Sequence, residues 1–107
     1  MTVLVQRAIL IYLTLSGLLV GVWATLFPRS FFDDFPGLGR TWVAVDGPYN
    51  EHLVRDVGGL NLALAFVAVM ALVTGSVLLA RVTGGAALLY GLPHFVYHAT
   101  HLGPYDT

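Results

Sequence analysis

The chain has 107 residues, of which 57% are hydrophobic and only 10% charged, and its mean hydropathy is +0.79. Soluble domains usually carry about 25% charged residues, so this chain lacks the charge to cover a water-facing surface, and its length predicts a single membrane domain over residues 1–107. The net charge of −1 gives no basic surface for nucleic acid, and the absence of cysteine excludes disulfides, iron–sulfur clusters and thiol nucleophiles.

Three runs without formal charge divide the chain, at residues 8–28, 57–80 and 82–105. Each run has at least the roughly 20 residues that an α-helix needs to cross a bilayer. The third also contains His residues and Pro93, and its span is expected at about residues 84–102. The sequence therefore predicts an all-α integral membrane protein with three transmembrane helices, at about residues 8–28, 57–80 and 84–102.

A polar loop is predicted between the first two helices, at residues 29–56, because this segment holds eight of the eleven charged residues. It also contains the turn-forming pairs Pro36-Gly37 and Gly47-Pro48. The second connection is expected at about residues 81–84, as a tight helical turn. This topology puts Arg7 and Arg81 on the same side of the cell membrane. Because acids offset the Arg residues of the loop, we expect a cytoplasmic N-terminus, with the loop and the C-terminus outside.

Small residues on the first two predicted helices suggest where helices approach each other. Gly17 and Gly21 form a Gly-x-x-x-Gly pattern on the first, and Ala65, Ala68 and Ala71 recur on the second. Such positions let helix backbones approach closely in a membrane. The pattern predicts close packing through Gly17 and Gly21, against a helix of this chain or of another.

The third predicted helix has one polar, aromatic side. At 100° per residue, His94, His98 and His101 fall within about 60° of one another, and Tyr90 and Tyr97 flank them. Polar side chains within a membrane usually face protein or water. We therefore expect this stripe to face something other than lipid.

A second polar cluster precedes the second helix, at His52, Arg55 and Asp56. In a three-helix topology this cluster lies at the same end of the bundle as His94, His98 and His101, so we expect the two groups to lie near each other. An ion pair of Arg55 with Asp56 would attach the loop to the helix.

Several roles for these residues are open. His94, His98, His101, His52 and Asp56 are candidate ligands for zinc, copper or iron, and a haem would need His52 or another chain opposite His94. Tyr90, Tyr97 and Arg55 are candidate contacts for a quinone or similar cofactor. The third possibility is that the histidines bond to loop carbonyls and Asp56 with no cofactor, and this is slightly favoured.

The segments 54–65 (Val-Arg-Asp-Val-Gly-Gly-Leu-Asn-Leu-Ala-Leu-Ala) and 91–98 (Gly-Leu-Pro-His-Phe-Val-Tyr-His) resemble helices of small bacterial membrane proteins of the DoxX-like type. The resemblance implies a bundle that generally has four spans, where this sequence predicts three. Some DoxX-like relatives are linked to quinone-coupled oxidation, so the resemblance also implies a possible redox role.

Three helices enclose little space for a substrate path and leave much of the polar stripe uncovered. The function expected from the sequence is therefore that of a small accessory or structural subunit, which binds other membrane subunits or itself and is not an enzyme. The alternatives are a small redox protein that binds a metal, haem or quinone through its His residues, and a transporter or channel formed by oligomerisation.

Overall fold

The computed structural model describes residues 2–102 and is mostly helical. Three helices of 24 residues each, α1 (Val3–Leu26), α3 (Glu51–Thr74) and α4 (Val77–Thr100), form its frame. By length and composition, α1 and α3 are apolar enough to cross a membrane. α4 is not among these candidates, since Arg81 and its His and Tyr residues lower its hydropathy. The end of the uncharged run 82–105 lies outside the described residues.

The helices begin and end at local capping signals rather than at charges. Thr2 caps α1 by accepting from the N–H of Val5, and Asn50 caps α3 by accepting from the N–H of Leu53. The helices α1 and α3 therefore begin several residues before the predicted spans at Ala8 and Val57. Because α3 begins at Glu51, the cluster expected before this helix lies within its first two turns.

The predicted turn at residues 81–84 is also wrong. α3 ends at Gly75, whose φ of 68° is the left-handed conformation that glycine adopts at helix ends. Ser76 then caps α4 by accepting from the N–H of Leu79. Arg81 consequently lies inside α4, one turn after its start, and the connection is shorter than expected.

The segment between α1 and α3 is largely ordered into short elements. α2 (Pro28–Asp34) begins with a proline, which suits the first position of a helix. Two short antiparallel strands follow, β1 (Pro36–Gly37) and β2 (Arg40–Thr41), and then the 3-10 turn η1 (Ala44–Asp46). Trp23 of α1 holds this segment: its ring packs edge-on against Phe31 and Phe35, and its Nε1 donates to Ser30 Oγ at 3.0 Å.

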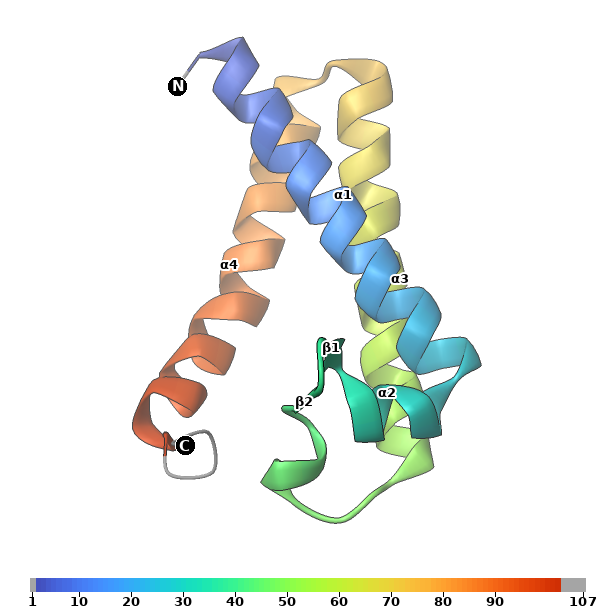
Figure 1. The fold of residues 1–107 in the computed structure, drawn as a ribbon. Helices are drawn as coiled ribbons and strands as arrows, with labels where there is room; N and C mark the ends of the chain where they lie inside the picture. The colour runs from blue at the N-terminus through green and yellow to red at the C-terminus, as the bar shows by residue number, and fades with distance from the viewer. Residues whose placement is uncertain (1, 103–107) are drawn as a thin grey trace.

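The helices α1 and α3 cross in close contact (Figure 1). A Cβ atom on Gly17 would lie 2.9 Å from the backbone oxygen of Asn61, and one on Gly21 would lie 2.7 Å from Leu62 side-chain atoms. The predicted close packing through Gly17 and Gly21 is confirmed, and the partner helix belongs to this chain. Ala65, Ala68 and Ala71 of α3 are buried, as their small size suggests.

The third helix, α4, packs differently. Near its start it lies beside α3, but its C-terminal half diverges from the α1–α3 pair, so the three helices form a V (Figure 1). The N-terminus and the Gly75 turn lie at one end of the V, and the ordered segment with the C-terminal end of α4 lies at the other. Only Thr83 of α4 is buried.

Candidate functional site

The inner face of α4, the side that carries Thr83, contains four of the eight predicted site residues. At 100° per residue, its members fall within about 80° of one another; they are Thr83, Ala87, Tyr90, His94, His98 and His101. Thr83 is buried against the bundle, whereas His94 and His101 are exposed. The face therefore runs from a packed region near the start of the helix to an uncovered region at its end.

The aromatic side chains of this region contact one another in a row. The Tyr90 ring stacks on His94 at 5.9 Å between centroids, and His94 meets His98 edge-on at 4.5 Å. Tyr97 contacts both of the later histidines and stacks on His101 at 4.0 Å. The predicted stripe of His and Tyr is thus one continuous set of ring contacts.

His101 is held by its own helix end. Its Nδ1 lies 2.7 Å from the backbone oxygen of Tyr97 and 3.1 Å from Thr100 Oγ1. A carbonyl oxygen only accepts, so this contact places a proton on Nδ1. His101 therefore contacts the end of its own helix rather than a loop carbonyl or Asp56.

The cluster on α3 makes the contact between His52 and Asp56 that a spacing of four residues predicts, but lacks the expected pair of Arg55 with Asp56. His52 Nδ1 lies 3.4 Å from Asp56 Oδ2, whereas Arg55 does not pair with Asp56. Instead, Arg55 Nε pairs with Glu51 Oε2 at 3.3 Å, and its Nη1 donates to the backbone oxygen of Thr25 at 2.9 Å. Arg55 therefore connects α3 to α1 itself and does not form the expected Arg–Asp pair.

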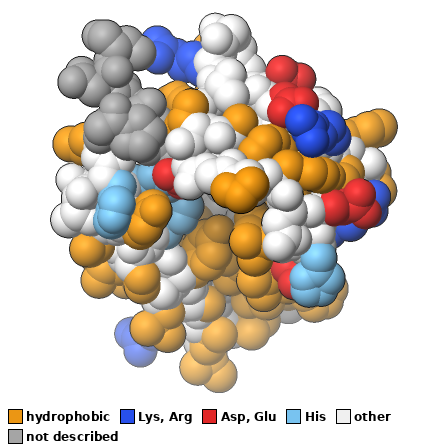
Figure 2. All heavy atoms as spheres, turned by 90° about the horizontal axis from the view of Figure 1, so that it is seen from below, with side chains coloured by type: hydrophobic (Ala, Val, Ile, Leu, Met, Phe, Trp, Pro, Cys, Tyr) orange, Lys and Arg blue, Asp and Glu red, His pale blue; other side chains and the backbone are white. Residues whose placement is uncertain are grey.

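The two clusters do not meet. In the view from this end of the molecule, the His side chains form two separate groups with other residues between them (Figure 2). Residues 2–102 hold no group of three His, Asp or Glu side chains close enough to share a metal ion. The expected proximity of His52, Arg55 and Asp56 to the His residues of α4 is absent because α4 diverges from α3.

The ordered segment supplies a carboxylate that the sequence did not reveal. Asp46 of η1 interacts electrostatically with His94, although the sequence suggested Asp56 for this role. Only the folding of residues 27–50 brings Asp46 to α4, and no motif around Asp46 signals this. Tyr97 and Tyr90 lie where they were expected, on the row of rings.

The inner face of α4 thus combines stacked imidazole and phenol rings and one nearby carboxylate, and its C-terminal part is exposed within the described residues. Compared with protein-family models, with curated proteins and with solved structures, the chain matches none of them.

Proposed function

We propose that the chain is a small membrane protein with three spans, α1, α3 and α4, and that it serves as an accessory subunit of a larger membrane assembly or homo-oligomer. The observation that carries this proposal is the inner face of α4, where no helix within residues 2–102 packs against the row from Tyr90 to His101. The partner is a helix that enters the V beside this row.

The dimensions of the molecule support a position across the bilayer. Its longest extent is 41 Å, which matches a bilayer of about 40–45 Å with its headgroups. Large apolar side chains on the outside of α1, α3 and α4 are exposed, among them Leu15, Phe66 and Leu88. Lipid tails satisfy such residues without a protein partner.

The polar row is what calls for a partner. Lipid cannot hydrogen-bond to imidazole or phenol groups, so such groups within a membrane usually face protein or water. Leu92 lies on the opposite side of α4 and suits lipid. A helix in the V would cover the row and leave the apolar side in contact with lipid.

Cysteine crosslinking tests this proposal cleanly because the chain has no native cysteine. We expect Tyr97→Cys, within the row, to form a stoichiometric crosslinked species in native membranes, and Leu92→Cys, on the opposite side of α4, to form none. A species of twice the chain mass identifies a second copy, and another defined mass identifies another subunit. A monomer by native mass spectrometry, with no crosslink from Tyr97→Cys, would overturn the proposal, as would crosslinking from Leu92→Cys alone.

A second function, metal binding, is favoured by the distance between the His94 and His98 rings. The His94 and His98 rings lie 4.5 Å apart on successive turns, close enough for both to reach one metal ion at the Zn–N distance of about 2.0–2.1 Å. Two histidines supply half of a tetrahedral ligand set, and a partner chain would supply the rest. The geometry fits a metal completed at the subunit contact better than one held by this chain alone.

Metal analysis of the purified protein separates this function from a purely structural one. Metal bound in a fixed ratio to the chain should be lost in His94→Ala and retained in His52→Ala, because His52 lies in the other group. Equal metal content in the two variants would eliminate His94 as a ligand.

A further inference from the structure

The turn between β1 and β2 carries a leucine at a position where asparagine or glycine is the usual residue. Gly37 pairs with Arg40, so Leu38 and Gly39 form a two-residue turn, and their φ angles are both positive, at 61° and 77°. Positive φ at both positions is the pattern of type I′ turns, which favour Asn-Gly. A bulky side chain is strained in this conformation. The shape of the turn therefore does not explain the presence of Leu38.

Packing within the chain does not explain Leu38 either. It is 97% exposed, more than any other large hydrophobic residue among residues 2–102. A Cβ atom on Gly37 or on Gly39 would have no atom within 4 Å, so the described part of the chain leaves open space around the turn. In water, Leu38 would thus be unfavourable both in its backbone conformation and in its surroundings. Strain and exposure at one residue indicate a contact with something outside the chain.

The residues that follow the turn suit a surface that is partly apolar and partly charged. Trp42 and Val45 are also large and exposed, at 45% and 42%. Arg40 lies on the exposed strand β2 and forms no ion pair within residues 2–102. An apolar tip next to a cation and a tryptophan is typical of segments at the boundary between lipid headgroups and acyl chains.

The place of the hairpin in the fold fits that boundary. In Figure 1, β1 and β2 lie at the level of the helix ends, between α2 and the C-terminal half of α4 in this view, whereas the connection that leads into α3 lies farther out. If α1, α3 and α4 span the membrane, the hairpin is at the level where the acyl chains meet the headgroups. The outer connection, at residues 47–50, is then farther from the bilayer centre.

We propose that the β1–β2 hairpin, residues 36–41, is a membrane anchor, and that Leu38 at its tip inserts among the acyl chains just below the lipid headgroups. Phospholipid fits this surface because the tip is apolar and Arg40 is opposite in charge to the lipid phosphate. This inference rests on the spanning arrangement proposed above, but neither on the subunit contact nor on metal binding.

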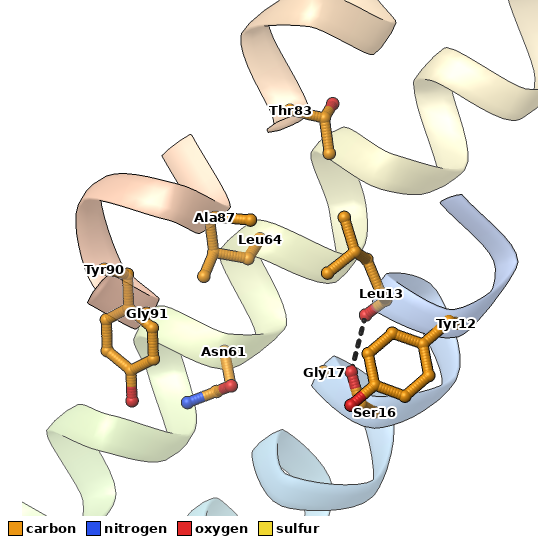
Figure 3. Close-up of a pocket in the computed structure, with 10 residues that line it drawn as sticks. All are labelled: Tyr12, Leu13, Ser16, Gly17, Asn61, Leu64, Thr83, Ala87, Tyr90 and Gly91. Carbon is orange, nitrogen blue, oxygen red and sulfur yellow. Dashed lines mark hydrogen bonds between the residues drawn. The ribbon is translucent and has the colours of Figure 1, made fainter. Parts of the chain in front are cut away.

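The hairpin can be altered without changing the interior of the V. The pocket between α1, α3 and α4 is lined by residues of these helices, among them Tyr12, Asn61 and Tyr90, and by none of the hairpin (Figure 3). The row from Tyr90 to His101 belongs to α4 alone. Variants of Leu38 therefore test the lipid contact separately from the inner face of α4.

A fluorescent label on introduced cysteines tests the depth of the tip, since the chain has no native cysteine. The full chain is placed in phosphatidylcholine nanodiscs and labelled with nitrobenzoxadiazole at Leu38→Cys, or at the exposed Pro48→Cys in the outer connection. A nitroxide on the upper acyl chain should quench the label at Leu38→Cys about two-fold more than at Pro48→Cys. Iodide in the water should quench the label at Pro48→Cys more strongly.

Photo-crosslinking identifies what contacts the tip. Leu38 is replaced by p-benzoylphenylalanine, which reacts with nearby C–H bonds, and the full chain is irradiated in native membranes. We expect a product with the mass of the chain plus one phospholipid, and no such product from the same replacement at Pro48. A crosslink from residue 38 to a protein, or no crosslink at all, would overturn the proposal.

Leu38→Asn tests whether the fold itself needs the leucine. Asparagine is favoured at this position of a type I′ turn, so Tm in detergent should be unchanged or higher. A lower Tm would show that Leu38 stabilises the fold, contrary to the proposal.

A third label position separates failure of the anchor from failure of the spanning arrangement. Leu88 is exposed near the middle of α4, so a nitroxide deep in the bilayer should quench a label at Leu88→Cys if α4 crosses the membrane. If that label is quenched by lipid and the label at Leu38→Cys is quenched only by iodide, the anchor is wrong and the spanning arrangement stands. If lipid quenches neither label, both are wrong.

Discussion

The guanidinium of Arg55 donates a 2.9 Å hydrogen bond from Nη1 to the backbone oxygen of Thr25, which lies thirty residues earlier in the chain. Thr25 is in the last turn of α1, where carbonyl groups have no partner within the helix. A cation also interacts favourably with the negative end of the helix dipole. Because Glu51 binds the same guanidinium, the start of α3 is fixed against the end of α1.

Arg55→Met should destabilise the fold, because it keeps the apolar stem of the side chain but removes both contacts. The side chain of Arg55 is 48% exposed, so the loss is expected to be about 1 kcal/mol rather than the larger values of buried charged hydrogen bonds. Thermal unfolding in detergent, followed by circular dichroism, should show a Tm lower by several degrees. Arg40→Met, on the exposed strand β2, is the control and should leave Tm unchanged; equal shifts would contradict the role of the Thr25 contact.

Two neighbouring glycines of α3 should respond in opposite ways to the same change. A Cβ atom on Gly58 would collide with Thr25 Oγ1 and lie 2.7 Å from the Thr25 backbone nitrogen, whereas one on Gly59 would meet nothing within 4 Å. Gly58→Ala should therefore force α1 and α3 apart and cost about 1–3 kcal/mol. Gly59→Ala should be neutral or stabilising by up to about 1 kcal/mol, because alanine favours the helix. The two free energies of unfolding, measured in the same detergent, test the close approach of the helices.

The helical class and the α1–α3 contact could be predicted because both depend on local patterns. Long apolar runs indicate helices, and Gly17 with Gly21 marks a face where another backbone can approach. The helix boundaries could not be predicted from charge, since Arg81 lies within a helix that Ser76 caps. The capping residues Thr2, Asn50 and Ser76 carried that information in the sequence.

The part of the candidate site that was predicted also depends on a local pattern in the sequence. The stripe of His94, His98 and His101 follows from helical periodicity alone, and the ring contacts agree with it. Its distance from His52 depends on the angle at which α4 leaves α3, and no periodic pattern specifies that angle. The role of Asp46 and the pocket around Asn61 depend on tertiary packing as well.

Removal of the Phe31 ring should loosen the segment between α1 and α3. Phe31 is buried, 5% exposed, and packs between Trp23 and Phe35. Phe31→Ala is expected to cost about 3 kcal/mol through the cavity that it leaves, and to change the near-ultraviolet circular dichroism of Trp23. Leu38→Ala, at a position 97% exposed, should alter neither signal. If the two variants behave alike, the aromatic cluster does not hold this segment.

The orientation in the membrane has a direct test. The N-terminus and the Gly75 turn lie at one end of the molecule, with Arg81 one turn beyond, and the strands β1 and β2 lie at the other (Figure 1). Three Arg residues lie at the second end against two at the first, but acids offset those three, so we expect the first end to be cytoplasmic. We expect a membrane-impermeant maleimide to label Thr41→Cys in intact bacterial cells, and to label Thr74→Cys only after the cells are opened. Both positions are exposed in the fold, so a difference in labelling reports the membrane rather than burial.

If intact cells were labelled at Thr74→Cys and not at Thr41→Cys, the orientation would be the opposite one. Equal labelling of both positions in intact cells would contradict a membrane-spanning arrangement, because it would place both ends of the helices on one side.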